Sequence, residues 1–263
     1  MKSIGFIGVG KMATAIISGL DKQKFDIFIS GHDLEKTQAQ AKALGVVAVS
    51  SHKALVSKSE LIILSIKPQV LPKVADEILS VLTKDKTILS IAAGFSLDDL
   101  AHLMTLENMP IIRVMPNINA QIGRSTSAIV KNDSVSADSF DFAKGIFETI
   151  GSVFEIEEKD FSTFTAIAGS SPAYIYMFMD ALARAGVLHG MPKALALSIV
   201  ADTVAACGEM VKISGENPWT LVDQVSSPGG TTVSGVVSLE KNRFVGTVID
   251  AITATIEKEK HLK

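Results

Sequence analysis

The sequence of 263 residues has few of the features that mark a secreted, metal-binding or nucleic-acid-binding protein. It contains a single cysteine, which excludes a disulfide framework and a cysteine-ligated zinc or iron–sulfur site. Basic runs are absent and the net charge is −3, so nothing in the charge pattern favours nucleic acid or an anionic membrane as a partner. Five histidines are scattered without ligand-cluster spacing, and we therefore expect no metal: His32, His52, His102, His189 and His261.

Long apolar runs are also scarce. A membrane span needs about 20 apolar residues, and the best windows, Ala194 to Val211 and Tyr174 to Gly190, each contain two charged residues. The segment from Met1 to Leu20 starts like a signal peptide, but Lys11 interrupts its apolar part and no small-residue cleavage site follows. We therefore expect a cytoplasmic protein without a membrane partner.

What is present, with 47% hydrophobic residues, is the composition of a globular protein. Up to about residue 156, short β-branched runs alternate with stretches of helical periodicity, which predicts an α/β fold with a mostly parallel sheet. The expected strands are Ser3–Ile7, Phe25–Ser30, Leu61–Ile66, Thr87–Ile91, Ile111–Met115, Thr126–Val130 and Val153–Ile156. The expected helices between them are Ala13–Leu20, Leu34–Leu44, Gln69–Leu82 and Leu97–Met104.

The strand pattern stops near Phe161, and only helical patterns follow. Gly190 and Gly215 are placed to end helices, Pro172 is expected to kink or split one, and Cys207 is expected to lie in the core. The expected helices are Phe161–Gly169, Pro172–His189, Pro192–Ile213, Pro218–Val225 and Thr231 to the C-terminus. The sequence thus predicts a Rossmann-like dinucleotide-binding domain over residues 1–158 and an all-α domain over residues 159–263.

The first strand is followed at once by a glycine motif. Gly8-Val9-Gly10-Lys11-Met12-Ala13 fits G-x-G-x-x-A, in which the first glycine makes the turn, the second admits a diphosphate and the small third residue packs against the strand. A diphosphate would then lie on the free N–H groups of the helix that begins there. The alternative is a tight turn without a ligand. The expected cofactor-binding residues here are Ile7, Gly8, Gly10, Lys11, Met12 and Ala13.

The end of the second expected strand indicates which dinucleotide binds. An NAD enzyme usually has an acid there to bind the ribose hydroxyls, whereas this chain has Ser30, followed by His32 and Lys36, which could bind a 2′-phosphate. Asp33 is as well placed to cap the next helix as to contact ribose. The pattern favours NADPH and leaves NADH open.

Three further turns follow strands whose carboxyl ends should face the same crevice. Small residues in the second of these turns would let a flat ring approach the backbone, although simple loop geometry is the alternative. The expected cofactor-binding residues are Ser65, Ile66, Lys67, Pro68, Ala92, Ala93, Pro116 and Asn117.

Two clusters of small and hydroxylated residues are unusual in a helical region: Gly169–Tyr174 and Val225–Thr232. The second ends one expected helix and begins another, so its hydroxyls and N–H groups could hold an anion. The alternative is an ordinary turn with Ser and Thr caps.

Taken with these clusters, the chain resembles the pyrroline-5-carboxylate reductase family over essentially its whole length. The resemblance rests on Gly5–Ala13, Lys67–Gln69, Ser90–Gly94, Arg113–Asn117, Gly169–Tyr174, Ala185–Pro192 and Pro218–Glu240. The departures are Gly31-His32, where many relatives have Asn-Arg, and Ser171 and Thr231, which replace a usual glycine and a usual alanine.

This resemblance implies the reduction of L-1-pyrroline-5-carboxylate to L-proline by hydride from NADPH or NADH. It implies that Ser227 and the backbone of Gly230 and Thr231 hold the substrate carboxylate, and that the catalytic hydroxyl of Thr232 lies near the imine nitrogen. It also implies a helical dimerisation domain, a substrate site shared between two chains, and possible rings of dimers. The expected substrate site further includes Ser226 and Glu158, and the expected cofactor site includes His52.

Two other classes of protein remain as alternatives. A 3-hydroxyacid dehydrogenase would need a catalytic lysine on a central helix, and the sequence has none between Pro172 and Lys193; an imine reductase would share the two-domain plan. A nucleotide-sensing protein without turnover would keep the glycine motif but would not need the cluster from Ser226 to Thr232.

Overall fold

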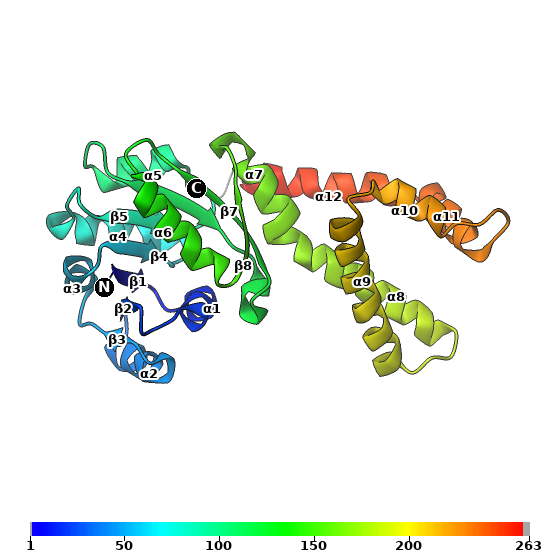
Figure 1. Ribbon diagram of the computed structural model, residues 1–263, viewed down its shortest axis with the longest axis horizontal. Helices are drawn as coiled ribbons and strands as arrows, with labels where there is room; N and C mark the ends of the chain where they lie inside the picture. Colours follow the sequence, from blue (N-terminus) through cyan, green and yellow to red (C-terminus); the bar gives the residue numbers. More distant parts are fainter. Residues whose placement is uncertain (1, 260–263) are drawn as a thin grey trace. The chain divides into compact units, whose positions relative to one another are not determined.

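The computed structural model describes residues 2–259, which form two compact units (Figure 1). Unit 1 contains the chain up to Gly169 and also Ile256–Glu259, and unit 2 contains Ser170–Thr255. The chain therefore leaves unit 1 and returns to it within the last described helix. The domain boundary expected after residue 158 stays a prediction.

Unit 1 is built on one eight-stranded sheet with the order β3-β2-β1-β4-β5-β6-β7-β8. Every neighbouring pair is parallel except β6 and β7, which are antiparallel. The strands are β1 Lys2–Ile7, β2 Phe25–Ser30, β3 Val47–Ala48, β4 Leu61–Leu64, β5 Thr87–Ser90, β6 Ile111–Met115, β7 Ser125–Lys131 and β8 Gly151–Glu155. The strand order changes direction between β1 and β4, which is the point where open α/β sheets bind ligands.

Helices cover both faces of this sheet because its strands are apolar on both sides. In β4, Leu61 and Ile63 pack with residues of α1, α2 and α6, whereas Ile62 and Leu64 pack with residues of α3, α4 and α5. The helices are α1 Lys11–Gly19, α2 Leu34–Leu44, α3 His52–Lys58, α4 Leu71–Ile78, α5 Leu97–Met104 and α6 Ala137–Glu148. Short 3-10 turns are η1 Pro68–Val70, η2 Leu79–Val81, η3 Ile118–Ile122 and η4 Glu158–Asp160.

These elements confirm the expected fold class of a mostly parallel, Rossmann-like sheet. All seven expected strands are present: β2 and β6 have the expected bounds, and the ends of the other five shift by at most two residues. The helices α2 and α5 also have the expected bounds. The two-residue β3, the short α3 and α6 were not expected. The first two are too short to show a period, and α6 interrupts its apolar positions with Gly145.

From η4 to residue 259, the last that the structure describes, the regular elements are all helices, as expected. The expected helix from Phe161 consists of α7 Phe161–Phe164 and the π-helical segment η5 Thr165–Ser170, and α8 Ser171–Leu188 continues from it. Pro172 is the second residue of α8 and comes directly after the π-helical segment. The remaining helices are α9 Lys193–Ser214, α10 Pro218–Gln224, α11 Thr231–Lys241 and α12 Phe244–Glu259. The last two replace one expected helix, because Arg243 between them has a φ of 58°; the end of that expected helix lies outside the described residues.

Unit 2 leaves many large apolar side chains exposed in a single chain, among them Met177 (72% exposed), Leu188 (80%) and Ile213 (84%). Cys207 on α9 is also exposed, so the expectation that it lies in the core is wrong for one chain. By length and composition α9 could cross a membrane, so the expectation that no window is apolar enough was too strict. One such helix is weak evidence for a span, since a helix that pairs with another chain also exposes apolar residues.

Candidate active site

The turn between β1 and α1 is held open by its glycines. Gly8 has a φ of 89°, and a Cβ built on it would lie 2.6 Å from Ile66 Cγ2 and 2.7 Å from the Ser65 carbonyl oxygen. The Gly8 N–H donates to the Ser30 carbonyl (2.8 Å), and the Ser65 hydroxyl donates to the Gly8 carbonyl (2.7 Å). Only glycine satisfies both the backbone angle and the available space here.

Gly10 has a different role, because its backbone is extended and a Cβ built on it would meet nothing within 4 Å. It is the N-cap residue of α1, and no side chain caps the helix. The start of α1 therefore has free space beside Gly10 and no side-chain cap for its first N–H groups, which lie at the positive end of the helix dipole. This arrangement fits a diphosphate, which needs free N–H donors and room for its oxygen atoms.

A cavity of about 430 Å³ lies beside this turn, at the carboxyl ends of β1, β2 and β4. It is also lined by residues most of which no sequence motif had singled out: Val9, Asp33, Lys36, Thr37, Val70 and Val74. Another such lining residue is Gln40 on α2, whose amide donates to the Val9 carbonyl (2.9 Å) and so fixes the turn. The cavity brings together these expected cofactor-binding residues: Gly8, Gly10, His32, His52, Ser65, Ile66 and Lys67.

Two residues at and after the end of β2, Ser30 and Asp33, make hydrogen bonds within the protein. Asp33 accepts a hydrogen bond from the Lys36 N–H (3.0 Å) and caps α2, as the sequence allowed. Ser30 is fully buried, and its Oγ lies 2.8 Å from Nδ1 of His52. Burial lowers the pKa of His52, and Glu77 opposes that effect. At neutral pH His52 is therefore uncharged in the free protein.

The other expected cofactor-binding residues lie around the same end of the sheet. Ile7 and Ala13 are fully buried beneath the turn, so they support the turn and α1 rather than a ligand surface. Ala92 is buried after β5. Asn117, after β6, is committed to the protein: its amide donates to the Ala168 carbonyl (3.0 Å) and its carbonyl oxygen accepts from the Asn119 N–H (3.1 Å).

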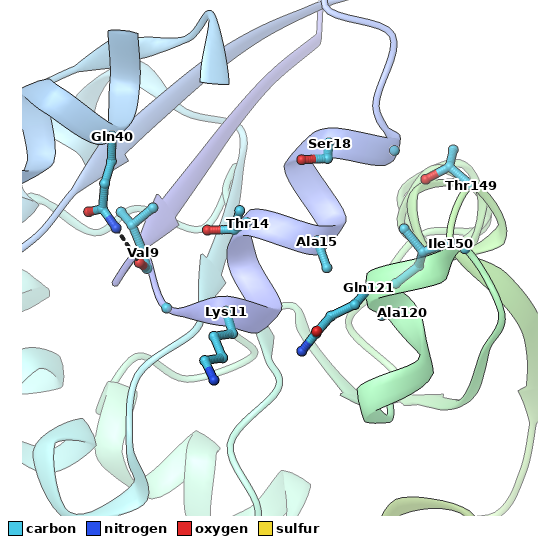
Figure 2. A pocket seen from close by; sticks show the side chains of 13 residues that line it. Val9, Lys11, Thr14, Ala15, Ser18, Gln40, Ala120, Gln121, Thr149 and Ile150 are labelled. Carbon is cyan, nitrogen blue, oxygen red and sulfur yellow. Dashed lines mark hydrogen bonds between the residues drawn. The ribbon is translucent and has the colours of Figure 1, made fainter. Parts of the chain in front are cut away.

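A second cavity, of about 730 Å³, lies beside α1 and shares Val9, Gly10 and Gln40 with the first. Figure 2 shows α1 between two walls, with Gln40 reaching Val9 on one side and Gln121, Thr149 and Ile150 on the other. Lys11 is the only charged side chain among its lining residues. The smaller cavity fits a nucleotide better, because it lies over the strand ends and contains His32, Lys36 and His52.

Glu158 lies in an ionic cluster around a buried arginine. Arg113 on β6 is 2.8 Å from Glu158 and 3.7 Å from Glu259 at the end of α12, and its guanidinium stacks 3.8 Å from the ring centroid of Phe161. Glu158 Oε1 also accepts from the Leu97 N–H (3.1 Å), while Oε2 is buried without a hydrogen-bond partner among residues 2–259. Arg113 thus contacts two segments of unit 1. Glu158 and Phe161 lie shortly before the chain enters unit 2, and Glu259 lies shortly after it returns.

The loop from Ser226 to Thr232 belongs to unit 2 and also has free polar groups. Gly230 is the N-cap residue of α11 and makes no side-chain cap bond, and its N–H donates to the Ser227 carbonyl (3.0 Å). Ser226 Oγ is buried and has no hydrogen-bond partner within the described part of the chain. An unsatisfied hydroxyl beside an uncapped helix start fits a carboxylate ligand. Thr232 is the second residue of α11, two positions after the N-cap residue, so it does not cap the helix.

Over residues 2–259, no group of three or more His, Cys, Asp or Glu side chains could hold a metal ion.

A mostly parallel sheet with a diphosphate-type glycine turn, joined to a helical unit, is typical of two-domain NAD(P)-dependent oxidoreductases. Family models agree: residues 158–262 match "Pyrroline-5-carboxylate reductase dimerisation" and residues 3–94 match "NADP oxidoreductase coenzyme F420-dependent". The chain is 36% identical to the pyrroline-5-carboxylate reductase of Pisum sativum, covering 99% of this chain and 96% of the relative. It is 37% identical to that of Escherichia coli (strain K12), covering 99% and 98%.

Solved structures agree with the family models. The 1-pyrroline-5-carboxylate reductase of Streptococcus pyogenes is 45% identical with a TM-score of 0.89, covering 99% of this chain and 98% of that chain. The NADP-bound Plasmodium falciparum pyrroline carboxylate reductase is 32% identical with a TM-score of 0.88, covering 99% and 97%. The chain belongs to the pyrroline-5-carboxylate reductase family. It is an NAD(P)H-dependent oxidoreductase of proline biosynthesis that self-associates through a dimerisation domain.

Proposed function

We propose that the chain reduces L-1-pyrroline-5-carboxylate to L-proline with the residues described above, using NADPH in preference to NADH. The observation that carries the proposal is the open, uncapped start of α1 at Gly10 beside a cavity that contains His32, Lys36 and His52. Reduced nicotinamide, when bound, supplies a hydride, so the protein has to bind, orient and exclude water.

Cofactor binding is divided among three sets of residues. Gly8, Gly10, Lys11 and Met12 present the diphosphate site, over the buried support of Ile7 and Ala13. His32, His52 and Lys67 face the cavity from three different segments and would hold the adenosine half. The remaining proposed residues follow β4, β5 and β6 and would place the nicotinamide half: Ser65, Ile66, Pro68, Ala92, Ala93, Pro116 and Asn117.

The substrate is held, in this proposal, by the loop before α11. The buried hydroxyl of Ser226, the Ser227 hydroxyl and the N–H of Thr231 offer donors to one carboxylate, and Gly230, whose own N–H bonds to the Ser227 carbonyl, lets the backbone approach the ligand. Glu158 is retained in the substrate site through its unpartnered oxygen Oε2. These groups fix the ring without bonding to the carbon that is reduced.

Thr232 is proposed to act on the imine itself. When the imine carbon gains a hydride, the carbon–nitrogen π pair moves to nitrogen, which requires one proton. The Thr232 hydroxyl can donate a hydrogen bond to that nitrogen or pass it a proton from solvent, which balances the reaction. Its contribution is greatest where charge changes on nitrogen, that is, in the transition state.

The assembly and compartment are proposed more specifically than the family assignment states them. We propose a dimer in which both chains contribute to the substrate site, with larger rings of dimers possible, and no nucleic acid, membrane or metal partner. The exposed apolar side chains of unit 2 support self-association. A single cysteine supports a cytoplasmic location.

The direct test mixes the purified protein with NADPH and pyrroline-5-carboxylate and follows the absorbance of the reduced nicotinamide. Loss of absorbance with formation of proline is expected. A protein that binds NADPH but does not consume it with this substrate would contradict the proposal and favour the nucleotide-sensing alternative. Turnover with a 3-hydroxyacid and oxidised cofactor alone would favour the dehydrogenase class.

A further inference from the structure

The side chain at the end of β2 is buried and hydrogen-bonded to a residue of another element. This position usually holds an acid that binds the ribose hydroxyls of NAD. Ser30 occupies it, is fully buried, and places its Oγ 2.8 Å from Nδ1 of His52, the first residue of α3. The serine hydroxyl is thus engaged with an imidazole from another element.

His52 itself reaches the nucleotide cavity. Its half-buried ring lines the cavity together with His32, Lys36 and the glycine turn. Because Nδ1 is taken by Ser30, the ring nitrogen left for a ligand is Nε2, for which the structure gives no hydrogen-bond partner among residues 2–259. The imidazole is therefore fixed through Nδ1, while Nε2 is available to a ligand in the cavity.

We propose that His52, oriented by Ser30, reads the 2′ position of the adenosine ribose and allows the chain to use both NADPH and NADH. This inference rests on the proposed function. A serine hydroxyl can donate to Nδ1 or accept from it, so the neutral ring can present Nε2 as donor or acceptor to a 2′-hydroxyl. The protonated ring donates from both nitrogens, to Ser30 and to a 2′-phosphate.

The charges around His52 set the direction of a pH effect. Burial lowers its pKa and Glu77 on α4 opposes this; Lys53 follows it on α3, while His32, Asp33, Lys36 and Lys67 line the same cavity. A 2′-phosphate would add negative charge beside the ring and raise its pKa. NADPH binding near neutral pH should therefore take up a proton at His52, and NADH binding should not.

The sign of the effect follows from this linkage. Below the pKa of the free protein His52 is already charged, and the full attraction to a 2′-phosphate is present. As pH rises through the pKa of the NADPH complex, the proton and the attraction are lost. The ratio of NADPH to NADH affinity should fall as pH rises from about 6 to about 8.

The test is titration calorimetry of the two reduced nucleotides, without substrate, in buffers of different ionisation enthalpy. His52→Asn keeps a hydrogen-bonding side chain but cannot be protonated. We expect this variant to bind NADPH about tenfold more weakly near pH 6, to keep NADH affinity within about threefold, and to lose most of the proton uptake. Ser30→Ala should shift all three quantities in the same direction by a smaller amount.

Two matched variants complete the experiment. His102→Asn removes an exposed histidine on α5, outside the nucleotide cavity, and should behave as the original protein does. His32→Asn reports how much of the NADPH affinity depends on the other cavity imidazole.

Unchanged proton uptake and an unchanged pH dependence in His52→Asn would overturn the inference, and so would an equal loss of both nucleotides. Absence of NADPH binding by the original protein would instead overturn the proposed function on which the inference rests. Thermal unfolding of each variant separates loss of binding from loss of fold.

Discussion

At the scale of single residues, the two glycines of the turn between β1 and α1 have different roles. Gly8 is fixed by its positive φ and by atoms less than 3 Å from a built Cβ, whereas Gly10 has ordinary angles and faces open space. Gly8 therefore shapes the protein, and Gly10 leaves room for the ligand.

Substitution separates these roles. Gly10→Asp should leave the thermal midpoint nearly unchanged but weaken NADPH binding on the order of 100-fold, since a carboxylate would stand where the diphosphate lies. Gly8→Ala should instead lower the free energy of unfolding by about 1–3 kcal/mol, because of its strained backbone. Calorimetric binding and thermal unfolding measure the two effects; full NADPH affinity in folded Gly10→Asp would refute the diphosphate site.

Thr232 lies after the N-cap residue of α11, and no side chain caps this helix. Thr232→Val should therefore cost little stability, whereas a hydrogen bond used in the transition state is worth about 10- to 150-fold in kcat/KM. NADPH binding should be unchanged.

Ser227→Ala should mainly raise KM, by about tenfold, because it removes a carboxylate contact. Steady-state kinetics distinguish the two variants, and normal turnover by Thr232→Val would remove its catalytic role.

At the scale of elements, the sequence predicted what periodicity and glycine patterns can encode. The buried strands and α2 and α5 follow from apolar runs and caps, and the cofactor cavity follows from strand ends meeting at one edge. The Ser30–His52 bond could not be predicted, because it joins residues of two elements of which one, α3, is too short to show a period. The engagement of Glu158 with Arg113 is likewise a tertiary contact.

The Arg113 cluster makes an element-scale prediction. Arg113→Met leaves Glu158 and the buried Glu259 without their shared guanidinium, and should lower the free energy of unfolding by about 2–4 kcal/mol. Arg113→Lys should be intermediate, since it keeps the charge but loses the planar fork. Urea unfolding measures both. Lys24→Met, which breaks an exposed pair with Asp21, is the control and should change little; an Arg113→Met midpoint equal to that of the control would show the cluster to be unimportant.

At the scale of the whole molecule, the apolar side chains of unit 2 predict that one chain is not the working form. Met177→Arg should reduce the number of subunits measured by light scattering and lower turnover, while NADPH binding by unit 1 persists. Glu107→Arg, on the surface of unit 1, should change neither quantity. An assembly that survives Met177→Arg would place the interface elsewhere on unit 2.

The return of the chain to unit 1 also dictates an order of events during synthesis. Glu259 follows Arg113 by more than half the length of the chain, and all of unit 2 is made between them. The nucleotide-binding sheet can therefore assemble while the chain is still on the ribosome. The ion pair between Arg113 and Glu259 can form only after α12 has been synthesised. A contact of such long range closes late. Full resistance of the nucleotide-binding unit to protease should therefore appear only after the last helix has been released.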